Sequence, residues 1–426
     1  MHLFRALVLG CCAVSVMSAA PAWGASFALS ENGAKAQGMA GAFVGQADDP
    51  SAVWYNPAGL LRVPKGGVVS LGANVFIPDI EAHDVNNVRT NAADAADADG
   101  EPGTILMTGN QYVSWRLSDR VAVGLGVNTP FGLSVDWEDD AFVRYQSAFA
   151  ELRTLFITPT VALQLSDRIA FGLGVSYVYA DAELERKIFF GPGLEDGTFQ
   201  LGGEARDWAY DAGIQAVLAE KLGAVERLTL GVTYHSAVVL DFNADDSVVR
   251  FTVPAAFAAA FPNSAASTTI DLPEIWTVGL SAEIGDRTTV NLDVGWLGWQ
   301  TFDGVRIAAE NPATQVLIAP IVRDYENTWV VRLGGEYRLD ETWAARLGYA
   351  YDETPIPDKT LDPLLPDANR HLVTAGVGFT HDRFSVDAAY SAFFFEEINT
   401  ATHQDGFNVD YDSFSHIFSL ALNYHF

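Results

Sequence analysis

The chain has 426 residues, of which 54 are acidic and 25 are basic, so its formal net charge is −29. Such an acidic chain lacks the clustered Lys and Arg that bind phosphates, which excludes a nucleic-acid-binding protein. Both cysteines, Cys11 and Cys12, lie near the N-terminus, which excludes disulfides, thiolate metal sites and cysteine nucleophiles from the rest of the chain.

Residues 1–24 have the features of a secretory signal peptide: Arg5 supplies the positive charge, residues 7–17 the apolar core, and Ala22-Trp23-Gly24 a small-x-small cleavage site. An alternative is lipoprotein cleavage at Gly10-Cys11, which would leave only a stub of apolar core after Arg5. No later stretch offers the ~20 uninterrupted apolar residues of a membrane helix. We therefore expect a secreted β protein or an outer-membrane barrel.

Residues 25–65 lack strand-like alternation. They include a stretch of small residues at 34–42, and Pro57 within Asn56-Pro57-Ala58-Gly59 indicates a turn, because proline has no backbone N–H to donate to a sheet. We expect these residues to form a compact plug inside a barrel made by residues 66–426. The alternative is a periplasmic tail with no gating role.

From residue 66 onward, side chains alternate with period two. Within residues 169–179 the odd positions are large and apolar, whereas most even positions are Ala, Gly or Ser. Alternation predicts about fourteen strands, with ends uncertain by ~2–4 residues. The predicted strands are 66–77, 104–117, 120–136, 152–165, 168–184, 206–220, 226–242, 270–284, 287–302, 327–339, 342–353, 369–380, 383–397 and 413–426.

The connections between these strands alternate between tight turns, such as Ser118-Asp119, and long polar or Pro-rich loops. An even number of strands with short turns at one end and long loops at the other is typical of bacterial outer-membrane barrels and not of Greek-key sandwiches. The sequence therefore predicts an all-β, fourteen-stranded antiparallel transmembrane barrel in the Gram-negative outer membrane, surrounded by lipid and lipopolysaccharide.

The third predicted strand contains Pro130, two residues before Gly132. Proline cannot donate to the ladder, and a closed barrel has no edge strand to accommodate it. We expect the strand to part from its neighbour here and leave a gap in the wall; the alternative is a harmless bulge. In a later loop, residues 253–261 are apolar enough to be a landing surface for a ligand or a lid packed on a neighbouring loop.

Several motifs resemble the FadL-type long-chain fatty acid transporters and follow one another in family order. They are Gly38-Met39-Ala40-Gly41-Ala42, Asn56-Pro57-Ala58-Gly59-Leu60, Asn128-Thr129-Pro130-Phe131-Gly132 and Thr354-Pro355-Ile356-Pro357-Asp358. The resemblance implies a fourteen-stranded barrel plugged by an N-terminal hatch, with a kinked third strand that opens toward lipid. It also implies a hydrophobic ligand, a fatty acid first of all, and a monomer.

The resemblance assigns roles to three groups of residues. The hatch or gate would be Phe27, Asn56, Pro57 and Ala58, and the lateral opening Asn128, Pro130, Phe131 and Gly132. The ligand-binding residues would be Leu184, Arg186 and Arg306. Alternation in the fifth strand places Leu184 and Arg186 on the lumen face, whereas parity points Arg306 outward unless a bulge intervenes. For each arginine the alternative is an ordinary salt bridge at the base of a loop.

Other functions are weighed against transport of fatty acids. A hydrolase would need a nucleophile motif, but no G-x-S-x-G occurs, so we expect no enzymatic activity. We expect no cofactor and no bound metal. A general diffusion porin would have an open polar lumen without a plug, and an adhesin would not respond to ligand. Uptake of aromatic or other uncharged hydrophobic compounds also stays open within the family.

Overall fold

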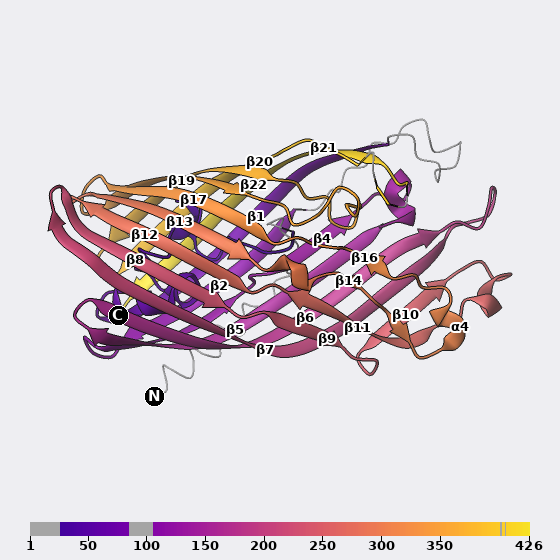
Figure 1. Cartoon of the computed structure of the whole chain (residues 1–426), viewed down its shortest axis with the longest axis horizontal. Helices are drawn as coiled ribbons and strands as arrows, with labels where there is room; N and C mark the ends of the chain where they lie inside the picture. Colours follow the sequence, from indigo (N-terminus) through magenta and orange to yellow (C-terminus); the bar gives the residue numbers. More distant parts are fainter. Residues whose placement is uncertain (1–25, 85–104, 401–402, 405) are drawn as a thin grey trace.

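The alternating segments form one closed antiparallel barrel in the computed structural model, which describes residues 26–84, 105–400, 403–404 and 406–426 (Figure 1). The predicted signal peptide, residues 1–24, lies outside the described residues. Fourteen spans make the wall, as predicted. In chain order these are β1 (Gly66–Asp84), β2 (Leu106–Arg116), β3 with β4 (Val121–Asn128 and Gly132–Asp136), β5 (Phe149–Ser166), β6 (Ile169–Ile188), β7 (Gly197–Leu222), β8 with β9 (Val225–His235 and Val238–Phe242), β11 with β12 (Ser264–Leu272 and Ile275–Ile284), β13 (Thr288–Leu297), β17 (Thr328–Arg338), β18 (Trp343–Asp352), β19 (Arg370–His381), β20 (Phe384–Phe395) and β22 (Val409–His425).

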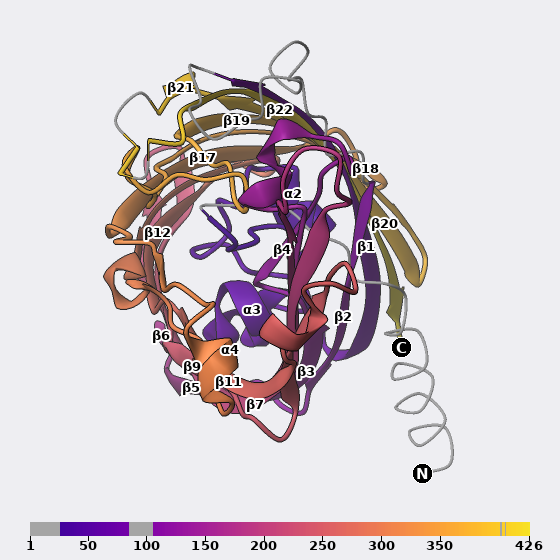
Figure 2. The ribbon, with the colours of Figure 1, turned by 90° about the vertical axis from the view of Figure 1, so that its right-hand side faces the viewer.

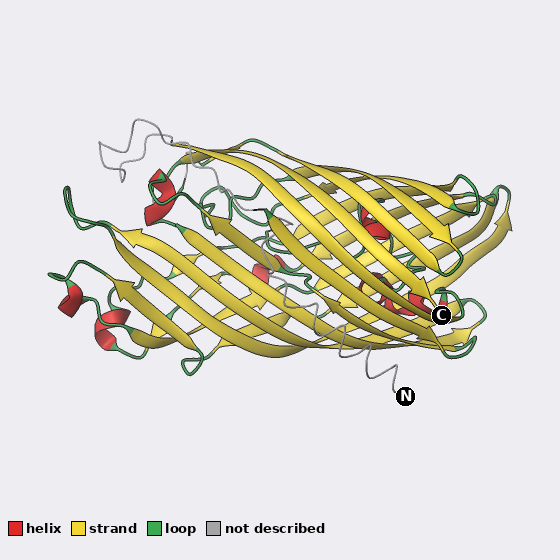
Figure 3. Ribbon diagram, turned by 180° about the vertical axis from the view of Figure 1, so that it is seen from behind, coloured by secondary structure: helices red, strands yellow, loops and turns green. Residues whose placement is uncertain are grey.

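The barrel closes where the last span meets the first. β22 pairs with β1 in an antiparallel register from Val68↔His425 to Asp84↔Val409. Closure removes the free sheet edges that would otherwise leave backbone groups unpaired in hydrocarbon. Figure 3 shows that the strands run obliquely along the wall and that the helices are short. None of the described helices is long and apolar enough to cross a membrane.

The outer face of the wall carries the large apolar side chains predicted by the alternation. These are exposed in the structure because in the cell they face lipid rather than water. They include Leu71, Leu173, Val175, Ile214, Val278, Leu292, Leu333, Leu347, Val377, Leu420 and Leu422.

Several predicted strand boundaries are wrong at the end of the barrel that carries the long loops. β1 continues to Asp84 and β7 begins at Gly197, and the loop predicted at 243–269 contains a further strand, β10 (Ser247–Thr252), between β7 and β11. These extensions carry polar side chains and weak alternation, so the pattern did not reveal them. The remaining short strands are β14 (Gly304–Val305), β15 (Ala308–Ala309), β16 (Ile321–Val322) and β21 (Ile398–Asn399).

Residues 26–65, here called the N-terminal segment, lie within the ring of strands (Figure 2). The segment contains only short helices, α2 (Ala34–Gln37), α3 (Ala52–Tyr55) and the 3-10 turn η1 (Pro57–Leu61). The other short helices lie in the loops: η2 (Phe142–Tyr145), η3 (Ala258–Ala260), η4 (Trp299–Thr301) and α4 (Pro312–Gln315).

Small residues on the inner face of the wall make room for the N-terminal segment. A Cβ on Gly172 would lie 2.3 Å from the carbonyl carbon of Pro57, and a Cβ on Gly348 would lie 2.3 Å from that of Met39. Both distances are far below van der Waals contact, so at these two places the backbone of the segment occupies the space that a wall side chain would need. The N-terminal segment therefore packs against the face of the wall on which the alternating pattern places small residues.

Candidate functional site

The third span of the wall is interrupted at Pro130. β3 ends at Asn128 and β4 begins at Gly132. β3 pairs with β2 as far as Gln111↔Val127, whereas β4 pairs with β5 alone among the described strands. Three residues, 129–131, stand opposite only two on β5, Thr154 and Leu155, so the interruption is a one-residue bulge.

At the break, the start of the N-terminal segment pairs with residues 130–132 on the side where β2 pairs with β3. The Leu29 backbone N–H donates to the Pro130 carbonyl at 2.8 Å, and the Gly132 N–H donates to the Phe27 carbonyl at 2.9 Å. Ala28 and Phe131 form an isolated antiparallel bridge. The structure thus brings the predicted gate residue Phe27 onto the predicted opening at residues 130–132.

Asn128 holds a second contact between the wall and the segment, because its side-chain amide donates to the Asn32 side-chain oxygen at 2.8 Å. Nearby, the Thr154 hydroxyl donates to the Phe131 carbonyl at 2.5 Å. The second of these bonds satisfies a backbone carbonyl at the interruption of the ladder.

Asn56, Pro57 and Ala58 lie elsewhere. The Asn56 amide donates to the carbonyls of Val44 and Ile214 at 3.0 and 3.1 Å, and its side-chain oxygen accepts from the Ala58 N–H at 3.1 Å. This turn is therefore bound to the wall at β7 and packs on Gly172 of β6. The predicted gate residues form two groups, and only Phe27 is at the wall break.

Above the break lies a cavity with an empty volume of about 780 Å³, here called the inner cavity. Its lining is mostly apolar and comes from the N-terminal segment, the wall and the loops. The apolar lining residues include Phe27, Leu133, Leu152, Ala182, Leu184, Leu201, Phe242, Ile270, Phe302, Tyr325 and Leu365. The Phe27 ring lines this cavity and packs edge-on against Trp299 and Phe302, with ring centroids 4.7 and 5.6 Å apart.

The cation of the inner cavity is Arg323, which the sequence did not reveal. Its Nη1 donates to Asp362 at 2.7 Å, but its buried Nη2 has no hydrogen-bond partner in the described part of the chain. Burial alone would lower the pKa of Arg323, but Asp362 beside it raises the pKa above the usual value, so the guanidinium stays charged. Arg323 lies in a long loop without periodicity, where position in the sequence does not indicate direction.

The predicted ligand-binding residues Leu184, Arg186 and Arg306 are dispersed. Leu184 lines the inner cavity, whereas Arg186 lines a separate outer cavity among the loops, with an empty volume of about 1080 Å³. The Arg186 guanidinium lies 4.9 Å from the centre of the Phe199 ring. Arg306 lines neither cavity, because its side chain is 72% exposed and pairs with Asp303 at 3.0 Å.

The apolar loop at 253–261 packs on its neighbour. Phe257 stacks on Phe190 with ring centroids 4.5 Å apart, and Phe261 contacts Phe190 and Phe251. Phe261 also lines the outer cavity, and the three alanines of η3 are not buried. The loop thus covers part of the outer cavity, and whether it opens as a lid stays a prediction.

Sequence comparison places the chain among outer-membrane proteins. Residues 15–426 match the family model described as "Outer membrane protein transport protein (OMPP1/FadL/TodX)". A putative outer membrane protein of Neisseria meningitidis serogroup B is 28% identical, over 84% of this chain and 83% of that protein. The long-chain fatty acid transport protein of Salmonella typhi is 24% identical, over 89% of each chain.

Solved structures share the fold. A FadL homologue of Pseudomonas aeruginosa superposes with a TM-score of 0.81 at 20% identity, covering 94% of this chain and 100% of that one. The toluene transporter TodX of P. putida superposes with a TM-score of 0.71 at 17% identity, covering 95% of this chain and 98% of that one.

Proposed function

Because the chain belongs to the FadL/TodX family of outer-membrane transport proteins, we propose that it carries long-chain fatty acids passively across the outer membrane. The family transports hydrophobic compounds, and its members are transporters and channels rather than enzymes. The choice of a fatty acid over an aromatic hydrocarbon is the finer part of the proposal.

One observation supports this choice: the mostly apolar inner cavity is lined by Arg323, whose buried Nη2 has no hydrogen-bond partner among the residues that the structure describes. A long hydrocarbon chain fits the apolar lining, and a carboxylate would accept a charge-assisted hydrogen bond from Nη2. An uncharged aromatic ligand would leave this donor unsatisfied, which costs about 1–3 kcal/mol for a buried polar group.

The proposed route has three stages. Ligand first adsorbs at the outer cavity, where Arg186 and several phenylalanines offer a cation beside apolar surface. It then enters the inner cavity and displaces Phe27, with Asn56, Pro57 and Ala58 as the fixed base of the hatch. It leaves sideways past Pro130 and Gly132 into lipid, which avoids the ~0.8 kcal/mol per methylene that passage into water would cost.

Replacement of Arg323 tests the substrate class. We expect Arg323→Met to weaken oleate binding about tenfold, as for the loss of one charge-assisted hydrogen bond, and to leave toluene binding unchanged. Arg323→Lys should retain most oleate affinity. Isothermal titration of the purified protein measures both ligands, with Arg306→Met as a control because Arg306 lines neither cavity.

The opposite result would assign the cavity to uncharged compounds. If Arg323→Met binds oleate as the wild type does, and wild-type protein binds toluene more tightly than oleate, the fatty-acid proposal fails. A toluene-like ligand would then be favoured by the apolar lining itself and by the pairing of Arg323 with Asp362.

A further inference from the structure

A second cavity lies on the other side of the first residues of the N-terminal segment. Phe27 lines the inner cavity, whereas Ala28, Leu29 and Ser30 line the second cavity, whose empty volume is about 720 Å³. Pro130 at the wall break lines the second cavity too, and the two cavities share no lining residue. The stretch 27–30 therefore separates the inner cavity from a space that reaches the break.

The second cavity contains a cation, Arg332, that forms no hydrogen bond or ion pair with the described part of the chain. Arg332 of β17 is half-buried and lines the cavity, and no residue in the described ranges forms a hydrogen bond or ion pair with it. A guanidinium presents five N–H donors, so a half-buried one without a protein acceptor is suited to an anion from outside the chain.

The other charged groups of this cavity already have partners. Arg370 pairs with Asp352 and lies 3.6 Å from Asp367. The His235 Nδ1 lies 2.6 Å from an oxygen of Asp211. Arg370 and His235 therefore each have a carboxylate within ion-pair distance, whereas Arg332 has none among the described residues.

Asp293 is the carboxylate that could compete for Arg332. One of its oxygens accepts the backbone N–H groups of Phe43 and Val44 at 2.8 and 2.9 Å, which fixes the side chain against the N-terminal segment. The Arg332 guanidinium does not come within ion-pair distance of it in the described structure. The other Asp293 oxygen, Oδ1, has no hydrogen-bond partner among the described residues, and both Asp293 and Glu31 attract Arg332 from beyond ion-pair distance. A ligand carboxylate that pairs directly with Arg332 therefore competes with these two weaker attractions.

The rest of the lining is apolar in large part. Its larger apolar members are Leu29, Val44, Trp54, Ile275, Leu297 and Val330. A single cation set among such side chains matches the carboxylate and the first methylenes of a fatty acid.

We propose that the second cavity is a further binding site for a fatty-acid carboxylate, with Arg332 as its counterion, occupied between the inner cavity and the wall break. The proposal rests on the proposed function. A carboxylate that left Arg323 and met no second cation would move toward lipid unpaired. Burying an unpaired charge in an apolar environment costs free energy. Arg332 stabilises the anion at that stage, so its removal slows passage more than it weakens binding in the inner cavity.

Transfer kinetics in proteoliposomes test this site, with oleate and the uncharged oleyl alcohol as probes. We expect Arg332→Met to slow oleate transfer about tenfold, the loss of one charge-assisted contact, while oleate affinity at equilibrium changes less than about twofold. Arg332→Lys should transfer oleate nearly as fast as the wild type, and all variants should transfer oleyl alcohol equally. Arg338→Met, on the same strand but outside the second cavity, is the matched control.

Two results would overturn the site while leaving the proposed function intact. Arg332→Met could transfer oleate at the wild-type rate, or it could slow oleyl alcohol as much as oleate, which would indicate a structural role. A wild-type protein that transfers neither probe would instead contradict the proposed function itself, and with it this site.

Discussion

At the scale of single residues, glycine and alanine on the inner face decide whether the lumen can be filled. Gly172 and Gly348 lie against backbone of the N-terminal segment at distances that leave no room for a side chain. The alternation therefore places large apolar side chains toward hydrocarbon on the outside of the wall. It places small residues toward the packed N-terminal segment on the inside.

We predict that Gly172→Ala destabilises the protein by about 1–3 kcal/mol, as other overpacked sites do, because its methyl group would overlap Pro57. Gly335→Ala is the control, because the nearest atom to a Cβ there is 3.8 Å away. Thermal unfolding in detergent compares the two. Equal melting temperatures would mean that the segment does not press on the wall at Gly172.

At the scale of elements, the third span shows how one extra residue opens a sheet. Asn128 and Leu133 both point into the lumen although they are five positions apart, an odd spacing that regular alternation does not allow. The bulge at residues 129–131 supplies the missing step, and beyond it β4 leaves β2.

Deletion of Pro130 should restore the ladder, because it removes both the extra residue and the residue that has no N–H donor. We predict at least about a tenfold loss of oleate uptake with the barrel still folded, since the lateral exit would then be paired shut. Pro130→Val keeps the extra residue and is expected to keep most uptake. Unchanged uptake after the deletion would remove the lateral route.

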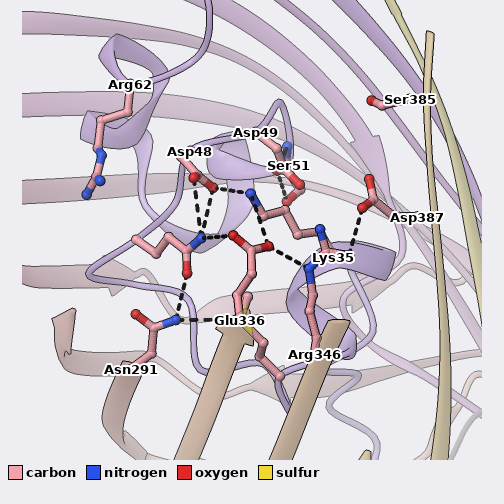
Figure 4. A network of polar contacts seen from close by, with 12 residues as sticks. Lys35, Asp48, Asp49, Ser51, Arg62, Asn291, Glu336, Arg346, Ser385 and Asp387 are labelled. Atoms are coloured by element: carbon pink, nitrogen blue, oxygen red, sulfur yellow. Dashed lines mark hydrogen bonds and ion pairs between the residues drawn. The ribbon is translucent and has the colours of Figure 1, made fainter. Parts of the chain in front are cut away.

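At the scale of the whole molecule, buried charges hold the N-terminal segment to the wall (Figure 4). Lys35 of the segment lies 2.8 Å from Asp48 and 3.7 Å from Glu336 of β17. Arg346 of β18 continues the network to Glu336 and Asp387 at 2.7 and 2.8 Å. The network thus links the body of the segment to β17 by a buried ion pair, whereas residues 27–29 are held at the break by backbone hydrogen bonds.

We predict that the wild type shows almost no steady conductance in planar bilayers, whereas a general diffusion porin would conduct. Arg346→Leu should loosen the segment and raise conductance, and lower stability by about 3–5 kcal/mol, because it removes the closest cation from the buried carboxylates of Glu336 and Asp387. Arg338→Leu, exposed on β17, is the control. A large conductance in the wild type, or none gained in Arg346→Leu, would contradict a fixed plug.

The sequence by itself determined the number of wall spans, the face of each that meets lipid and the position of the third-strand break. These are local properties: period two follows from strand geometry, and proline lacks its donor whatever surrounds it. It placed Leu184 correctly on the lumen face, because alternation holds within a regular strand.

Only the tertiary structure decided which cations enter the cavities. Arg323 reaches the inner cavity from an aperiodic loop, and Arg332 is distinguished by the absence of a partner among the described residues rather than by its place in a pattern. Likewise, no local signal pairs Leu29 with Pro130, about a hundred positions away in the chain. Contacts of this kind form only when the barrel closes around the segment.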